Sequence, residues 1–271
     1  MNDNELISTR LGGKDFFKTS YYKFEKFSQI KKQYLKQAPY PILDFGIGES
    51  DQMPPIAVLD ELTKQAYIYK NRVYADNGIE PFKEAAKKHL KEIYQIDCDK
   101  QHLAINHVIG AKSALCIIPF AFVSDEDVVI CTTPGYQVLP TMAKWLKGKI
   151  YEVPLTKQNQ YLPNLESIPV EIYQKTKIFL VNYPNSPTGA IATKEFYAQL
   201  LKKAKQYGFL IVNDCVYGPL TYHTEPLSIF SIPDSENYCI EVHSLSKAFN
   251  MTGFRIGFMV ANEKLMHILK E

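Results

Sequence analysis

Short apolar runs alternate with stretches in which apolar residues recur every three or four positions, from about residue 55 to the end of the chain. The short runs are rich in Val and Ile and predict buried strands at 128–131, 177–182, 209–213 and 238–242. The amphipathic stretches predict helices at 80–94, 112–122, 137–146 and 193–207. This alternation predicts an α/β fold in which helices flank a mostly parallel central sheet.

The first fifty residues lack this alternation. They are rich in Tyr, Phe and Lys and are interrupted by Gly12-Gly13, Pro39 and Pro41. We interpret residues 1–50 as an N-terminal arm and linker, and residues 51–271 as one large domain.

Composition narrows the classes of partner. The chain has 271 residues, 46% of them hydrophobic, and a net charge of +2. Such a balance favours a small-molecule partner over nucleic acid or a membrane surface. Five cysteines are scattered without a CxxC pair, and we see no secretory signal, so we expect a cytoplasmic protein without a metal site.

The segment HSLSKAFNMTGFRIGF, residues 243–258, contains the first candidates for chemistry. A lysine such as Lys247 becomes a nucleophile toward carbonyls when its pKa is lowered. Arg255 can bind phosphate in a bidentate manner, and the hydroxyls of Ser244 and Ser246 can bind the same anion. The alternative is a surface lysine near an unrelated arginine.

Asp214 and Tyr217 lie in the segment VNDCVY at the end of a predicted strand. Ligand sites in α/β sheets lie at such strand ends. A carboxylate at this position could keep the pyridine nitrogen of a cofactor protonated. Alternatively, Asp214 is an ordinary turn or cap residue.

Two further segments have weaker signals. The segment VNYPNSPTG, residues 181–189, leads from a predicted strand into a turn-rich loop, which by itself is usually a plain connection. In the segment VIGAKS, residues 108–113, small residues begin a helix whose free N–H groups could bind phosphate. A simple helix start explains the second segment equally well.

In this order, the four segments resemble the fold-type I, class I/II aminotransferases, which use pyridoxal 5′-phosphate. The resemblance runs from about Tyr22 to the last residue. It implies that Lys247 holds the cofactor as a Schiff base and later moves a proton between substrate and cofactor. It also implies that Asp214 pairs with the pyridine nitrogen, that Tyr217 binds the phenolic oxygen and that Tyr136 stacks on the ring. The residues implied around the phosphate are Ala111, Lys112, Ser244, Ser246 and Arg255.

The resemblance also implies a homodimer. Tyr74, in the segment VYADNG, matches a family tyrosine that reaches the phosphate of the neighbouring subunit. Ordinary packing is the alternative for both Tyr74 and Tyr136, since the chain has 18 tyrosines.

Three segments look more specifically like the LL-diaminopimelate aminotransferase group: TSYYKF at 19–24, DFGIGE at 44–49 and SIFSIPD at 228–234. This narrower likeness implies that Tyr22 and Gly48 lie near the substrate. It implies transfer of an amino group between an amino acid, LL-diaminopimelate being one candidate, and a 2-keto acid.

The sequence departs from the family at two places. Ser186 stands where the family usually has an asparagine that contacts the cofactor's phenolic oxygen. The chain also stops at Glu271, before the C-terminal small domain that supplies the arginine for the substrate's α-carboxylate. We therefore expect a fragment or truncated product. A non-catalytic protein that binds pyridoxal phosphate or a partner is one alternative, and a lyase or decarboxylase on the same fold is another.

Overall fold

The computed structural model describes residues 7–11, 13, 23–37 and 39–270. The chain divides into two compact units, Met1–Gly48 and Glu49–Glu271, and each is described here by itself. The division lies near residue 50, where the sequence pattern changes; the roles assigned to the two segments stay predictions.

The described part of the first unit contains a short 3₁₀ helix, η2 (Thr9–Leu11), and helix α2 (Lys23–Leu35). Lys31 on α2 forms an ion pair with Asp44. Asp44 also accepts a hydrogen bond from the Gly46 N–H at 2.9 Å. These contacts hold the segment before Gly48 against the helix, although exposed pairs of this kind stabilise a structure only weakly.

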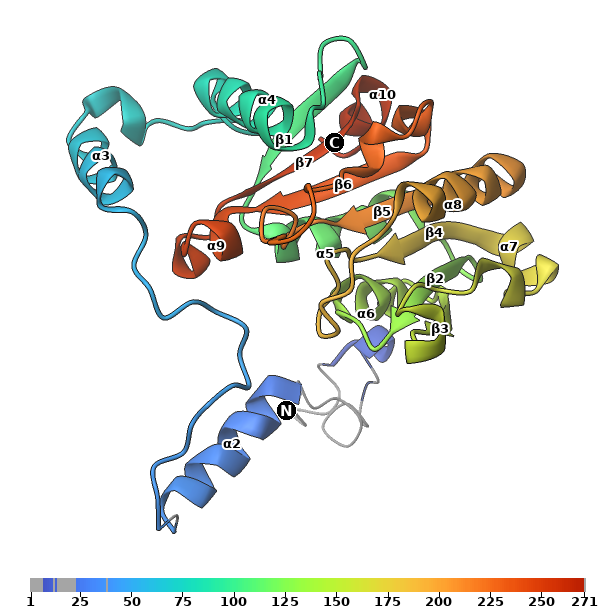
Figure 1. Ribbon diagram of the computed structural model, residues 1–271, viewed down its shortest axis with the longest axis horizontal. Coiled ribbons are helices and arrows are strands. Elements are labelled where there is room, and N and C mark those ends of the chain that lie inside the picture. The colour runs from blue at the N-terminus through green and yellow to red at the C-terminus, as the bar shows by residue number, and fades with distance from the viewer. Residues whose placement is uncertain (1–6, 12, 14–22, 38, 271) are drawn as a thin grey trace. The chain divides into compact units, whose positions relative to one another are not determined.

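A seven-stranded sheet forms the centre of the second unit, in the order β1-β7-β6-β5-β4-β2-β3 (Figure 1). Only β7 runs antiparallel to its neighbours, β1 and β6. The prediction of a mostly parallel sheet flanked by helices is therefore confirmed. The strands are β1 (Leu103–Val108), β2 (Val128–Thr133), β3 (Lys149–Pro154), β4 (Thr176–Val181), β5 (Leu210–Asp214), β6 (Cys239–Ser244) and β7 (Gly257–Asn262).

The helices of this unit include the four that the sequence predicts. Thr193 caps one of them by accepting a hydrogen bond from the Phe196 N–H at 3.1 Å, and Gly208 ends it in the left-handed conformation. The α-helices are α3 (Ile56–Ala66), α4 (Glu80–Tyr94), α5 (Ala111–Phe122), α6 (Val138–Trp145), α7 (Val170–Lys175), α8 (Lys194–Tyr207), α9 (Leu245–Ala248) and α10 (Glu263–Ile268). The 3₁₀ helices are η4 (Tyr69–Arg72), η5 (Lys157–Asn159), η6 (Leu165–Ser167), η7 (Ile229–Ser231), η8 (Ser235–Asn237) and η9 (Thr252–Phe254).

Two hydrophobic cores lie on opposite faces of the sheet. Leu90 of α4 and Leu200 of α8 belong to one core, together with Ile211 of β5. Helices α5 and α6 contribute to the other core, which contains Val212, the next residue of β5. Because side chains alternate along a strand, Asn213 faces the α4/α8 side and Asp214 faces the α5/α6 side.

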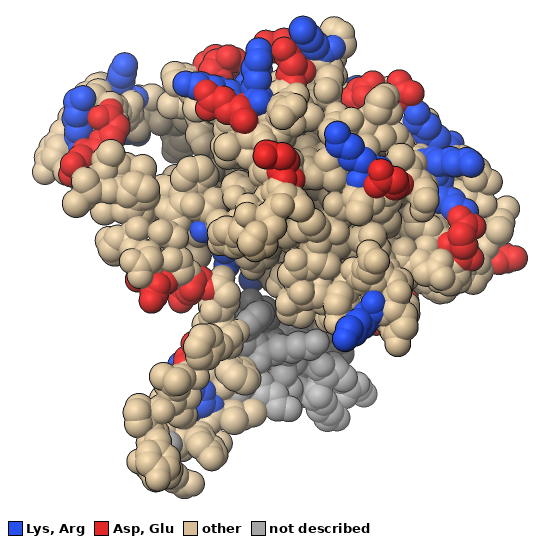
Figure 2. Space-filling model, in the orientation of Figure 1, with Lys and Arg blue, Asp and Glu red and all other residues tan. Residues whose placement is uncertain are grey.

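Acidic and basic side chains are interspersed on the face shown in Figure 2. On α4, for example, Lys87 lies 3.0 Å from both Glu84 and Asp99. Within the described residues, no helix is long and apolar enough to cross a membrane.

Candidate active site

Apart from Tyr74, the predicted site residues of the large unit lie along the edge of the sheet that the carboxyl ends of its parallel strands form. Strands β1, β5 and β6 end at this edge, and β7 begins there with Gly257, which pairs with both Val108 and Ser244. Residues after the ends of β1, β2, β4, β5 and β6 therefore lie along the same side of the sheet, as ligand-binding residues do in open α/β sheets.

Arg255 and the start of α5 form a cationic cradle at this edge. A Cβ atom at Gly110 would lie only 2.4 Å from Nη2 of Arg255, so the guanidinium lies directly against this glycine. Nη1 of Arg255 donates to the Thr252 carbonyl at 2.7 Å, which orients the side chain. Gly110 is the N-cap of the 12-residue helix α5 and offers no side-chain cap. A guanidinium beside the N-terminus of a helix is suited to bind phosphate.

Ser244 and Ser246 are buried beside this cradle. Ser244 pairs with Gly257, and an added Cβ atom at Gly257 would lie 3.4 Å from the amide nitrogen of Ala111. The Ser244 hydroxyl also accepts a hydrogen bond from the Ser246 N–H at 3.1 Å and thereby caps α9. Lys112 is exposed at the second position of α5.

Lys247 lies on α9, half-buried, with Nζ 5.8 Å from the centroid of the Tyr217 ring. Burial lowers the pKa of this lysine, and the charge of Arg255 lowers it further, whereas Glu49 and Asp214 act in the opposite direction. A lowered pKa increases the fraction of neutral, nucleophilic amine.

Asp214 is 3% exposed, and its Oδ1 atom has no hydrogen-bond partner among the described residues. Burial raises the pKa of this carboxyl to about 7, although a hydrogen bond from the Val216 backbone and the charge of Lys247 oppose the shift. A buried acid with an unsatisfied oxygen fits a cationic partner such as a protonated ring nitrogen.

Ser186 contacts Tyr217. Its side chain hydrogen-bonds the phenol, which opposes the rise in the Tyr217 pKa that burial causes. Asn182, which the sequence analysis did not select, positions Ser186: its Oδ1 atom accepts from the Ser186 N–H at 2.7 Å, and its Nδ2 atom donates to the Asp214 carbonyl at 2.7 Å. Its position directly after the apolar strand β4 is the feature of the sequence that could have identified Asn182.

The two remaining tyrosines of the large unit differ in exposure. Tyr136 follows β2 and packs partly buried against the core on the α5/α6 side. Tyr74 is fully exposed, at 102% of its reference area, so packing among the described residues of the large unit does not explain it. Asn77 holds the Tyr74 loop against β1, because its carbonyl accepts from the His107 N–H at 3.1 Å.

Neither predicted substrate residue belongs to the large unit. Tyr22 lies outside the described residues, and Gly48 belongs to the first unit, where it is exposed. Their roles stay predictions.

An α/β sheet with a lysine, a buried acid and an anion cradle at one edge has side chains suited to a charged small molecule. The chain belongs to the family described as aminotransferase class I and II, which matches residues 40–271. It is 43% identical over 264 residues to the LL-diaminopimelate aminotransferase of Methanocaldococcus jannaschii and 39% identical over 264 residues to that of Methanococcus maripaludis. The narrower resemblance predicted from the sequence is thus confirmed.

Both matches cover 96% of this chain and 63% of the relative, so the chain spans 63% of the length of these relatives. Among solved structures, apo-BacF from Bacillus subtilis has a TM-score of 0.88 at 27% identity, covering 98% of this chain and 66% of that one. The aspartate aminotransferase of Thermotoga maritima has a TM-score of 0.84 at 26% identity, covering 97% and 68%.

Proposed function

We propose that this chain binds pyridoxal 5′-phosphate and forms the cofactor-binding part of an aminotransferase that moves an amino group between an amino acid and a 2-keto acid. The observation that carries the proposal is the meeting of Lys247, Asp214 and the Arg255 cradle at one sheet edge. The names of the relatives support LL-diaminopimelate as the amino acid.

The cradle is proposed to hold the phosphate. Arg255 supplies the charge, the first turn of α5 at Ala111 and Lys112 supplies N–H donors, and Ser244 and Ser246 supply hydroxyls. Asp214 would keep the ring nitrogen protonated. When bound, the cofactor supplies an electron sink, and this proton strengthens it. Tyr217, supported by Ser186, binds the phenolic oxygen, and Tyr136 covers the ring.

Lys247 has two proposed roles. Its neutral amine would hold the cofactor through the cofactor's aldehyde carbon. With substrate bound, the Lys247 amine would also act as the acid and base that moves a proton between the substrate Cα and the cofactor. The lowered pKa of Lys247 favours both roles, because each needs the unprotonated amine.

Further parts of the proposal concern groups beyond the described edge. Tyr22 and Gly48 are proposed to lie near the substrate, and Tyr74 to reach the phosphate of a second copy in a homodimer. A cytoplasmic location stays a prediction; the five cysteines are free, as is usual for proteins of that compartment.

Titration with pyridoxal 5′-phosphate tests the proposal. We expect a visible absorbance band that Lys247→Ala abolishes and that the exposed-lysine control Lys202→Ala retains. Borohydride reduction followed by peptide mapping should place the cofactor on Lys247. A parent chain that neither binds the cofactor nor is labelled at Lys247 contradicts the proposal.

The half-reaction identifies the chemistry. LL-diaminopimelate should bleach the band, and a 2-keto acid should restore it. Bleaching without restoration, with release of carbon dioxide or ammonia, indicates a lyase or decarboxylase; an unchanged band indicates a protein that only binds the cofactor.

A further inference from the structure

A carboxylate is completely buried on the α4/α8 face of the sheet, opposite the cofactor residues. Glu241 of β6 is 0% exposed, yet four donors surround it. Its Oε1 atom binds Ser228 Oγ at 2.8 Å and His243 Nε2 at 2.9 Å. Its Oε2 atom accepts from Asn213 Nδ2 at 2.9 Å and from the Ile229 N–H at 3.0 Å. Burial alone would raise the pKa of Glu241, but the bonds from His243, Ile229 and Asn213 hold it below the usual value.

The neighbours of Glu241 connect it to both cofactor strands. Asn213 precedes Asp214 on β5, and His243 precedes Ser244 on β6. Asn213 pairs with Glu241 in the sheet, so the carboxylate fixes the two strands side by side. Because side chains alternate, the residues that follow, Asp214 and Ser244, point to the opposite face, where the cofactor is proposed to bind.

Aromatic packing holds the network in place. The His243 ring stacks on Phe258 of β7 with centroids 4.7 Å apart, and Tyr94 of α4 contacts the same imidazole edge-on at 5.5 Å. Strand β7 is the one that begins beside Ala111 in the cradle. The network therefore joins β5 and β6, which end at Asp214 and Ser244, to β7, which begins two residues after Arg255.

We propose that Glu241 is a positioning residue: its carboxylate, through Asn213 and His243, fixes the ends of β5 and β6 so that Asp214 and the Ser244–Lys247 turn meet the cofactor in the correct relative position. The proposal rests on the proposed function for its cofactor. Its structural core, a clamp between two strand ends, does not.

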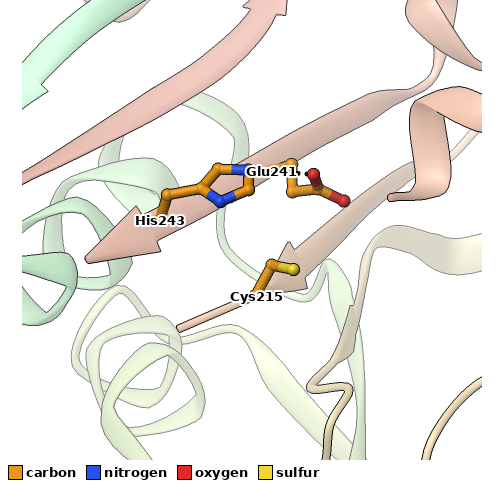
Figure 3. A group of neighbouring side chains, drawn as sticks. All are labelled: Cys215, Glu241 and His243. Carbon is orange, nitrogen blue, oxygen red and sulfur yellow. Dashed lines mark hydrogen bonds and ion pairs between the residues drawn. The ribbon is translucent and has the colours of Figure 1, made fainter. Parts of the chain in front are cut away.

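A metal ion is the competing interpretation, because ligand atoms of Cys215, Glu241 and His243 lie within 4.8 Å of one another (Figure 3). Figure 3 shows His243 and Glu241 on β6 and Cys215 just after β5. Each carboxylate oxygen already has two hydrogen-bonding neighbours, and a metal would have to displace some of them. The saturated carboxylate favours a hydrogen-bonded clamp.

Amide hydrogen exchange of the cofactor-free protein tests the clamp directly. In Glu241→Gln, an NH₂ group replaces one carboxylate oxygen and faces the donors that this oxygen accepted from. Amide exchange should therefore rise about tenfold or more at 214–217 and 244–247. Exchange in strands β2 and β3 should stay unchanged. The amides to follow include Cys215 N–H, bound to the Val242 carbonyl, and Leu245 N–H, bound to the Ile256 carbonyl. The same substitution at half-exposed Glu236 is the control and should change neither region.

Cofactor affinity is the second readout. Glu241→Gln should raise the Kd for pyridoxal 5′-phosphate on the order of tenfold, the scale on which supporting hydrogen bonds act around a bound group, and Glu236→Gln should not. Unchanged exchange at both strand ends overturns the clamp. Raised exchange in Glu241→Gln supports the clamp even if the parent binds no cofactor, and that second result refutes the proposed function. Binding of one Zn²⁺ ion per chain by the parent, and its loss in Glu241→Gln, would also overturn the clamp.

If Glu241→Gln does not fold, two changes at His243 take its place. His243→Gln keeps an N–H donor for the carboxylate, whereas His243→Phe keeps a ring against Phe258 without a donor. Parent-like exchange in the first and raised exchange in the second support the clamp, and equal exchange in both overturns it.

Discussion

The buried Asp214 carboxylate lowers the stability of the cofactor-free fold, and the same side chain is proposed to bind the cofactor. The carboxyl is buried at the end of β5, and its Oδ1 atom has no partner among the described residues. Burial shifts its pKa from 3.8 to about 7. Such a shift destabilises the cofactor-free fold, and a cationic ring nitrogen would remove the cost.

This shift predicts how the stability of the cofactor-free protein depends on pH. The unfolded chain loses the Asp214 proton near pH 4, whereas the folded chain keeps it until about pH 7. Ionisation therefore lowers the free energy of unfolding as the pH rises through this window, by about 4 kcal/mol for a shift of three units. Above about pH 8 the penalty is constant.

Asp214→Asn should remove this penalty. Urea unfolding of the cofactor-free proteins should find the variant more stable than the parent at pH 8, with the difference narrowing toward pH 5. Asp60→Asn, an exposed change on α3, is the control. The same Asp214→Asn protein should bind pyridoxal phosphate more weakly, since an amide cannot hold the ring proton. A variant that is no more stable than its parent at pH 8 contradicts the assigned burial cost.

At the scale of elements, the start of α5 depends on a residue without a side chain. Gly110 adopts a φ of 73° and lies against the Arg255 guanidinium. A Cβ atom would clash with the guanidinium in addition to straining the backbone. The glycine thereby lets the helix N-terminus and the guanidinium lie side by side, as the proposed phosphate site requires.

Gly110→Ala should therefore impair phosphate binding as well as stability. We expect the Kd for pyridoxal 5′-phosphate to rise at least about tenfold, as loss of a charge-assisted contact of roughly 1.5–3 kcal/mol requires. Gly208→Ala is the matched control: its φ is 75°, but nothing lies within 4 Å of the added Cβ. That variant should lose about 1–2 kcal/mol of stability from backbone strain alone and keep its affinity. Equal affinities in the two variants would show that Arg255 does not bind the phosphate.

Element by element, the sequence predicted what continuous apolar runs encode. Strands β2, β4 and β5 were found because each contains an unbroken apolar run, and β6 was found from Val242 and the apolar residues before Glu241. Strand β3 was missed because it lies at the sheet edge, where Lys149 and Glu152 are exposed. Strand β1 was missed because Asn106 and His107 interrupt its apolar pattern, and α9 because four residues are too short for a helical period.

At the scale of the whole molecule, strand order decides which residues meet. Strand β7 inserts between β1 and β6, although β1 and β7 lie at opposite ends of the large unit's sheet-forming sequence. This insertion brings Arg255 to Gly110 and completes the cradle. No local pattern contains that meeting, because it depends on pairing between distant strands.

Assembly belongs to the same scale. We expect a homodimer in which Tyr74 binds the neighbour's phosphate. Removal of its hydroxyl in Tyr74→Phe should raise the Kd for pyridoxal 5′-phosphate about tenfold, as for a hydrogen bond to a charged group. Sedimentation velocity with parallel titrations should show this effect only at protein concentrations at which dimers form. Tyr67→Phe, another exposed tyrosine, is the control. A purely monomeric parent, or equal affinities of the Tyr74 and Tyr67 variants, would contradict the assignment.

The α/β class, the family and the residue types at the candidate site could be predicted from the sequence, because strand runs and short motifs are local properties of the chain. The sequence did not reveal that Asp214 is buried with a free oxygen, that Gly110 supports Arg255, or that Glu241 holds four donors behind Asp214 and Ser244. These points follow from contacts between segments that are far apart in the chain. Burial, pKa and hydrogen-bond saturation depend on which distant segments pack around a side chain, and the strand order sets that packing.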